Sequence, residues 1–245
     1  MSTDRKVEGM LGNPLIVVTG ASQGIGAAIA RRFASEGACS LALIARNRSR
    51  LEEVANECRN FSGVSAEVFV CDLTDPEAVD EMAAAVKKRF GAPAVLVNNA
   101  GGFVAGSFLE FSLKDFDAMW EINLRSAFLV SKAFVPAMVE AGKGDVFNIG
   151  SIAALGAHPG GTGYCAAKAG LLGLTRVMRH ELKSHGIRVM SILPGPVETP
   201  SWDGSGMPSE RLMPTEDIAE TVVTLARLSG RTLPEEIILR PMVEE

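Results

Sequence analysis

"VTGASQGIGAAIA", residues 18–30, begins at the end of the apolar run "LIVV" (15–18) and continues into a segment rich in alanine and isoleucine. Three glycines, Gly20, Gly24 and Gly26, fall at the turn between this predicted strand and the predicted helix. Glycine at such a turn lets the backbone approach a pyrophosphate, and the helix N-terminus supplies N–H donors and positive potential. The spacing therefore predicts a dinucleotide-binding turn, and the alternative is an ordinary turn between strand and helix.

Short aliphatic runs recur on either side of this turn, at 15–18, 40–45, 66–70, 94–98, 146–150, 187–193 and 236–240. Segments with helix signals lie between them; Ser49 followed by Glu52, for example, predicts the start of a helix. Strands that alternate with helices form right-handed βαβ units and one parallel sheet. We predict the α/β class, with a single doubly wound (Rossmann-like) domain at 14–245, helices on both faces of a seven-stranded parallel sheet, a polar arm at 1–13 and a lid at about 200–214.

Composition narrows the classes of function. A net charge of −5 over 245 residues argues against a dedicated nucleic-acid binder. No apolar run reaches the roughly 18 residues of a membrane span, and the charged first residues lack the apolar core of a signal peptide. The four cysteines form no CxxC pair, which predicts reduced, buried thiols in a cytoplasmic protein rather than a metal site or a disulfide: Cys39, Cys58, Cys71 and Cys165.

The chain contains a single tyrosine, Tyr164, and Lys168 follows it by one helical turn. Residues at i and i+4 face the same way on a helix. An ammonium about 4 Å from a phenol favours the phenolate by roughly 4 kcal/mol, which corresponds to about three pKa units. The pair thus predicts an acid–base group, Tyr164, whose charge state is set by Lys168. The alternative is two unrelated surface residues on one helix.

"TGASQGIG" (19–26) together with "YCAAK" (164–168) resembles the short-chain dehydrogenase/reductase family, and the resemblance extends from about residue 13 to the end. Further matching motifs follow in order, namely "CDLTD" (71–75), "NNAG" (98–101), Asn123, "NIGSIA" (148–153) and "PGPVET" (194–199). The ending "LPEEIILRPMVEE" departs from the glycine-bearing end of many members. It resembles a branch that acts on 3-oxoacyl compounds and 3-hydroxy acids.

The resemblance implies hydride transfer between a nicotinamide cofactor and a small-molecule carbonyl or secondary alcohol. It implies that Tyr164 exchanges a proton, that Lys168 also holds the nicotinamide ribose, and that Asn123 holds a relay water. Ser151 follows the strand at 146–150, where its hydroxyl can bond the developing oxyanion. The cofactor contacts that it implies are Gly20, Ser22, Gln23, Gly24, Ile25, Gly26, Arg46, Asp72, Leu73, Asn99, Ala100, Gly101, Tyr164, Lys168, Pro194, Gly195, Val197 and Thr199.

Several alternatives stay open at this point. The substrate can be a 3-oxoacyl carrier compound, a small 3-hydroxy acid or a polyol, and a non-catalytic nucleotide sensor would keep the glycine turn without the chemistry. His158, Trp202 and Met207 can face the substrate or serve as loop and packing residues. The family pairs the helices that carry Tyr164 and Asn123 across a two-fold axis, which predicts a homodimer or homotetramer.

Arg46 bears on the choice of cofactor. It lies 20 residues after Gly26, where domains that prefer NAD place an acidic residue for the ribose 2′-hydroxyl. A guanidinium can instead bind a 2′-phosphate in a fork, and Arg48 would add positive potential. We therefore expect NADP(H), with NAD(H) as the alternative if these arginines are only solvated loop charges.

Overall fold

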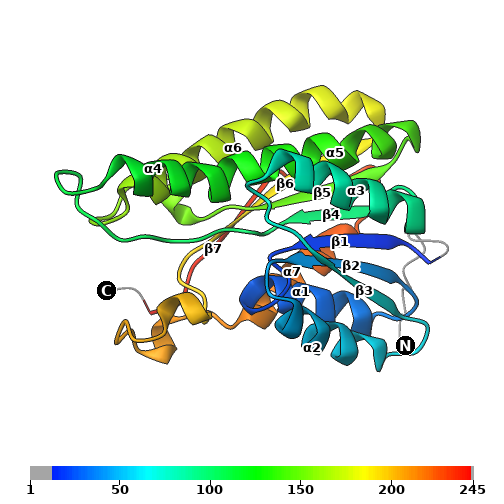
Figure 1. Cartoon of the computed structure of the whole chain (residues 1–245), viewed down its shortest axis with the longest axis horizontal. Coiled ribbons are helices and arrows are strands. Elements are labelled where there is room, and N and C mark those ends of the chain that lie inside the picture. The colour runs from blue at the N-terminus through cyan, green and yellow to red at the C-terminus, as the bar shows by residue number, and fades with distance from the viewer. Residues whose placement is uncertain (1–12, 244–245) are drawn as a thin grey trace.

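The structure is a computed structural model that describes residues 13–243. Its centre is a sheet of seven parallel strands in the order β3-β2-β1-β4-β5-β6-β7 (Figure 1). The strands are β1 (Leu15–Thr19), β2 (Ser40–Ala45), β3 (Ser65–Val70), β4 (Val95–Asn98), β5 (Gly144–Ile149), β6 (Ile187–Pro194) and β7 (Glu236–Leu239). The predicted fold class is confirmed, and each predicted strand is present. Apart from Asn13, the predicted polar arm lies outside the described residues.

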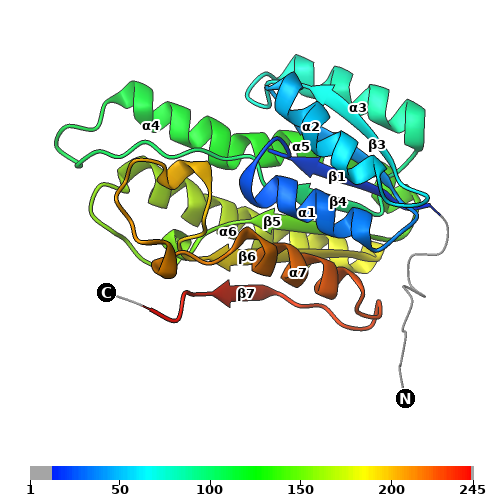
Figure 2. The same ribbon diagram turned by 90° about the horizontal axis from the view of Figure 1, so that it is seen from below.

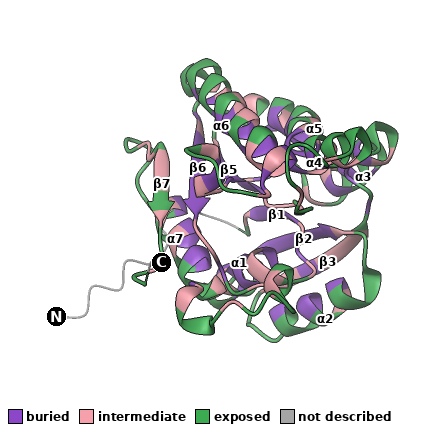
Figure 3. Ribbon diagram, turned by 90° about the vertical axis from the view of Figure 1, so that its left-hand side faces the viewer, coloured by how far each residue is buried: buried purple, intermediate pink, exposed green. Residues whose placement is uncertain are grey.

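Helices cover both faces of the sheet (Figures 1 and 2). One face carries α1 (Gly24–Ser35), α2 (Arg48–Arg59) and α7 (Thr215–Ala226). The other carries α3 (Pro76–Phe90), α5 (Ser126–Glu140) and α6 (Thr162–Leu182), with α4 (Leu113–Trp120) packed on α6. Because both faces are covered, the central strands are buried along nearly their whole length, as Figure 3 shows.

The strand order reverses between β1 and β4, which lie side by side. Doubly wound sheets bind ligands at such a switch point, outside the carboxyl ends of the strands. Thr19, the last residue of β1, joins the two strands there. Its hydroxyl donates to the carbonyl of Val97 (3.2 Å) and accepts from the N–H groups of Asn99 (2.9 Å) and Ala100 (3.1 Å). The loop after β4 is thereby held beside the glycine turn after β1.

The start of α2 differs from the prediction. Asn47, not Ser49, is the N-cap, and its side-chain oxygen accepts from the N–H of Arg50 at 3.1 Å. Asparagine is at least as good a cap as serine, and here it already has the extended backbone that a cap requires. The helix therefore begins earlier, at Arg48, and this shift changes which arginine reaches the cofactor cavity.

The segment Leu113–Glu140 forms one continuous helical stretch that contains a π-helical turn at Glu121–Arg125. Within residues 13–243 it is the one helix long and apolar enough, by length and composition, to cross a membrane. The count of apolar runs did not anticipate it. Its most apolar window has a mean hydropathy of 1.2 and is 56% buried against the rest of the protein, as expected of a core helix.

Candidate active site

A cavity of about 870 Å³ opens at the carboxyl ends of the strands, around the switch point. It is bounded by the loops that follow β1 to β6 and by the segment that contains the predicted lid. The four predicted catalytic residues all line it. So does every predicted cofactor contact except Gly26. The structure thus brings together residues from seven separate sequence motifs.

The glycine turn after β1 has the backbone that the sequence predicted. Gly20 and Gly24 have φ values of 63° and 54°, a region that residues with a Cβ atom rarely adopt. Gly26 does not line the cavity, and its predicted cofactor contact stays a prediction. It is buried, and a Cβ atom there would overlap Gly20 O and lie 2.5 Å from Asn99 Nδ2. The absence of a side chain at Gly26 allows α1 to approach the loop after β4 closely.

The N-terminus of α1 also has the features of a phosphate site. The N-cap residue Gln23 makes no side-chain capping bond, so the first N–H groups of α1 lack a side-chain partner. Gly24 and Ile25, which begin the helix, line the cavity. Free N–H groups and the positive end of the helix dipole together favour an anion at this point.

Two arginines line the end of the cavity beyond β2, and they are Arg46 and Arg50. Arg48, the first residue of α2, is exposed and does not line it. One turn later, the guanidinium of Arg50 donates to the side-chain oxygen of Gln23. The supporting role of Arg48 stays a prediction, and Arg50 is the cavity-lining arginine that sequence reasoning missed.

Asp72, after β3, borders the same end of the cavity. Its carboxylate accepts from the N–H (3.0 Å) and the hydroxyl (2.8 Å) of Thr74. These hydrogen bonds, with a smaller contribution from the positive charge of Arg46, hold the pKa of Asp72 below its ordinary value. Asp72 is thus a charged hydrogen-bond acceptor at neutral pH, suited to ribose hydroxyls or an adenine amino group.

Tyr164 and Lys168 lie near the N-terminus of α6, and Lys168 Nζ is 5.6 Å from the centroid of the Tyr164 ring. The ammonium is buried and donates to the carbonyl of Ile149 at the end of β5 (2.9 Å). Burial lowers the pKa of Lys168 to about 8. Ser151 follows β5, and its hydroxyl caps the short turn Ile152–Ala154 through the N–H of Ala153 (3.1 Å).

The pKa of Tyr164 departs from the prediction. Burial raises it above its ordinary value, and the neighbouring Ser151 hydroxyl lowers it by less than burial raises it. The expected lowering by Lys168 is not found in this structure. The ammonium is directed to a backbone carbonyl, and desolvation penalises the phenolate and the ammonium alike.

Asn123 lies in the π-helical turn and is 1% exposed. Its amide donates to the carbonyls of Gly102 (2.9 Å) and Met119 (3.1 Å), and its oxygen accepts from the N–H of Gly102 (3.2 Å). The bond to Met119, four residues earlier, competes with the helical ladder, and a π turn at this point accommodates it. Asn123 thereby fixes the loop after β4 against the helix.

Aromatic and apolar side chains border the cavity beside Tyr164. Phe103 packs edge-on against Tyr164, with ring centroids 5.3 Å apart at 88°, and its ring lies 6.1 Å from that of His158. Trp202 and Met207 line the same cavity from the predicted lid, which contains two short 3-10 turns. Sequence reasoning singled out His158, Trp202 and Met207 as possible substrate-facing residues but missed Phe103.

The cysteines are free thiols. Three of them are buried, while Cys165, next to Tyr164, is only partly buried, which corrects the expectation that all four are buried. Burial raises the pKa values of Cys39, Cys58 and Cys71 to about 12, 11 and 11. Within the described part of the chain, no group of three or more His, Cys, Asp or Glu side chains is arranged to hold a metal ion.

Comparison with known proteins places this site in a family. The family model described as short chain dehydrogenase matches residues 14–207. An uncharacterised oxidoreductase of Staphylococcus saprophyticus is 32% identical over 232 residues, covering 95% of this chain and 99% of that protein. One from Staphylococcus aureus strain USA300 is 31% identical over 233 residues, covering 95% and 99%.

Solved structures agree with this result. An alcohol dehydrogenase from the archaeon Thermococcus sibiricus, complexed with 5-hydroxy-NADP, has a TM-score of 0.89 and 33% identity, covering 96% of this chain and 99% of that one. A metagenomic short-chain oxidoreductase in complex with NADP has a TM-score of 0.83 and 35% identity, with the same coverage. Since the family match spans most of the chain and these relatives align over nearly all of it, this protein belongs to the short-chain dehydrogenase family.

Proposed function

We propose that the protein is an NADP(H)-dependent oxidoreductase that interconverts a carbonyl compound and its secondary alcohol. One observation carries the proposal: Ser151, Tyr164 and Lys168 border the same cavity as the glycine turn. A bound nicotinamide cofactor would supply or accept the hydride. The side chains of this protein would supply the proton and hold the reacting oxygen.

The cavity fits a nicotinamide dinucleotide. Gly20 and Gly24 shape a turn that leaves room for a pyrophosphate, and the start of α1 offers N–H donors to it. The structures of two relatives were solved with NADP or 5-hydroxy-NADP. In this chain Arg46 and Arg50 would hold a 2′-phosphate, and Ala45 supplies no carboxylate to repel it. These residues support NADP(H) over NAD(H).

The proton chemistry follows from the positions of the four polar residues. Because burial raises the pKa of Tyr164, its phenol stays protonated at neutral pH and can donate to the carbonyl oxygen in the reductive direction. The Ser151 hydroxyl would hold that oxygen as negative charge develops. The Lys168 ammonium, mostly charged below its pKa of about 8, has N–H groups left for the ribose hydroxyls. Asn123 would hold the water that returns a proton.

The substrate candidates remain those of the sequence, namely a 3-oxoacyl compound, a small 3-hydroxy acid or a polyol. A cytoplasmic location is part of the proposal. A nucleotide sensor without chemistry is disfavoured, because such a protein has no need of a buried ammonium beside a phenol in its cavity.

A panel of ketones, aldehydes and dicarbonyls, assayed with NADPH and NADH in parallel, tests the proposal. We expect oxidation of NADPH with at least one of them. Tyr164→Phe should lower kcat by about 100- to 10,000-fold, because the ring stays and the proton donor is lost. Its dissociation constant for NADPH should change little, whereas Lys168→Ala should lose both binding and turnover. Near-normal turnover by Tyr164→Phe would overturn the assignment.

A further inference from the structure

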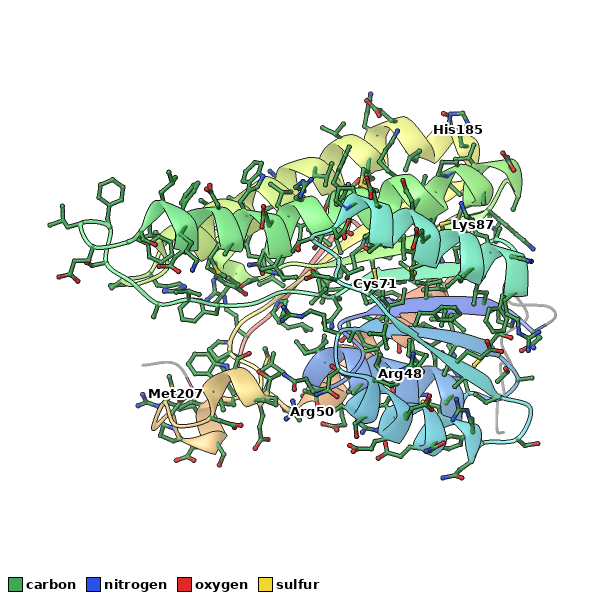
Figure 4. The ribbon with its side chains drawn as sticks, in the orientation of Figure 1. Arg48, Arg50, Cys71, Lys87, His185 and Met207 are labelled. Carbon is green, nitrogen blue, oxygen red and sulfur yellow. The ribbon has the colours of Figure 1, made fainter. Side chains whose placement is uncertain are left out.

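Three segments contribute large apolar side chains to the cavity that Tyr164 borders. The loop after β4 contributes Phe103, the turn after β5 contributes Ile152, and the segment after β6 contributes Trp202 and Met207. Figure 4 shows Met207 on the segment at the lower left of the molecule, away from Arg48 and Arg50. Large apolar side chains therefore border this cavity from three segments, and one of them, Phe103, packs directly on Tyr164.

The cationic side chain next to Tyr164 is Lys168, which is buried and already bonded to a backbone carbonyl. Among the described residues that line it, the lysines and arginines are Arg46, Arg50 and Lys168. The two arginines lie at the end beyond β2. Lys168 is 4% exposed and donates to the carbonyl of Ile149. A carboxylate on the substrate would thus lose hydration without gaining a dedicated cation, which is unfavourable.

His158 borders the cavity from the loop after β5. Its Nδ1 lies 3.2 Å from the carbonyl oxygen of Pro159. Its ring lies 6.1 Å from that of Phe103 and adds to the aromatic surface there.

Phe103 has the position of a selecting residue. Its side chain is 46% exposed, so part of the ring is available to a ligand. The Phe103 ring also packs edge-on against the ring of Tyr164, with the two centroids 5.3 Å apart. The preceding residue, Gly102, is bonded through both its N–H and its carbonyl to Asn123, which fixes the loop. An apolar group beside the reacting carbonyl would gain a preformed aromatic contact there.

We propose that the substrate is an uncharged carbonyl compound bearing an aromatic or bulky aliphatic group, and that Phe103 selects it. This inference rests on the proposed function and narrows it. It disfavours 3-hydroxy acids with a free carboxylate and retains 3-oxoacyl esters and thioesters, whose carboxyl group is uncharged.

The predicted preference for an uncharged substrate is tested with ethyl 5-oxohexanoate and 5-oxohexanoate. In both compounds three methylene groups separate the ketone from the ester or carboxylate. With NADPH, kcat/KM for the ester should exceed that for the acid by about tenfold or more, mainly through KM. An equal or higher value for the acid would overturn the proposal.

Phe103 is tested with 4-phenyl-2-butanone and 2-butanone. Phe103→Ala should lower kcat/KM for the phenyl ketone about tenfold while changing that for 2-butanone less than about twofold. Phe103→Leu should recover part of the loss. The matched control is Phe108→Ala on the same loop, because Phe108 is 81% exposed and does not line the cavity. Equal losses on both ketones would assign Phe103 to positioning Tyr164 and refute its role in selection.

Failure of the proposed function has a different signature, namely no NADPH oxidation with any of these ketones or with the wider panel. In that case the inference is tested by calorimetry, which measures how tightly the NADP⁺-saturated Tyr164→Phe enzyme binds the ester and the acid. Tighter binding of the ester supports it, and equal or tighter binding of the acid overturns it.

Discussion

Lys168 combines a positive charge with almost complete burial, and its side chain is 4% exposed. Burial destabilises the charged ammonium much more than the neutral amine, and the pKa of Lys168 therefore falls to about 8. A lysine with a pKa near neutrality is well placed to be an activity switch. At pH 7 it is an ammonium, whereas above pH 9 it is mainly a neutral amine.

The pH dependence of ketone reduction should show this titration. Deprotonation removes the charge that we propose holds the cofactor, so kcat/KM for NADPH should be flat from pH 6 to about 7.5. Above pH 8 it should fall about tenfold per unit, because this ratio reports ionisations of the free enzyme. The raised pKa of Tyr164 places the loss of its proton at higher pH, outside this window.

Lys168→Arg is the control for the pH profile. A guanidinium stays charged throughout the range, so this variant should be less active but should lack the fall near pH 8. A profile in the natural protein that stays flat to pH 10 would contradict the assignment.

Arg46 and Arg50 should set the preference for NADPH. A charge-assisted hydrogen bond contributes about 1.5–3 kcal/mol, which corresponds to roughly a ten- to hundredfold preference. Ala45→Asp combined with Arg46→Ala should move the preference towards NADH. Arg50→Ala alone should lower kcat/KM for NADPH about tenfold and leave that for NADH nearly unchanged.

Arg48→Ala is the matched control for the cofactor variants, because its side chain is exposed and does not line the cavity. It should change kcat/KM for either cofactor less than about twofold. Equal kcat/KM values for NADPH and NADH in the unmodified protein would refute the preference while leaving the proton chemistry intact.

At the scale of elements, α1 and the loop after β4 meet at Gly26. The side-chain amide of Asn99 donates to the carbonyls of Thr19 (3.0 Å) and Gly20 (3.3 Å), and Gly26 packs directly on this group. The first turn of α1 is thereby held close to the glycine turn and to the loop after β4. This contact involves backbone atoms, which cannot move aside as a flexible side chain can.

Gly26→Ala should therefore lower the free energy of unfolding by about 1–3 kcal/mol, despite the higher helix propensity of alanine. It should also weaken NADPH binding, because α1 must shift. Gly173→Ala is the control: this glycine is inside α6, and an added Cβ atom meets nothing within 4 Å. The control should be neutral or stabilising in urea unfolding, and an equally stable Gly26→Ala variant would contradict the packing argument.

At the scale of the whole molecule, the outer face of the α4–α5 stretch exposes large apolar side chains. Leu113, Phe116, Trp120 and Phe128 are 74%, 37%, 47% and 45% exposed. Val177 on α6 is 52% exposed. Apolar surface gathered on two helices is typical of a protein interface, and these are the helices through which the sequence predicts self-association.

We expect light scattering at micromolar concentration to give the mass of a dimer or tetramer. Phe128→Glu should shift the mass towards the monomer, because a charge would be buried in the interface. Phe61→Glu is the control, since Phe61 is 40% exposed but lies beyond the end of α2. A monomer in the unmodified protein, or equal dissociation by both variants, would refute the predicted interface.

Local features of the sequence were enough to predict the sheet, the glycine turn and the shared helical face of Tyr164 and Lys168. Each depends on residues within a few positions of one another, through hydrophobic periodicity, backbone freedom or the helical repeat. Features that depend on distant parts of the chain could not be read in this way. The pKa of Tyr164 is raised rather than lowered because desolvation depends on what packs around the phenol. Arg50 replaces Arg48 beside the cavity because Asn47 starts α2 early and Gln23, 27 residues away in sequence, accepts from its guanidinium. Phe103 meets Tyr164 only because Asn123, from a later helix, binds the loop that carries it.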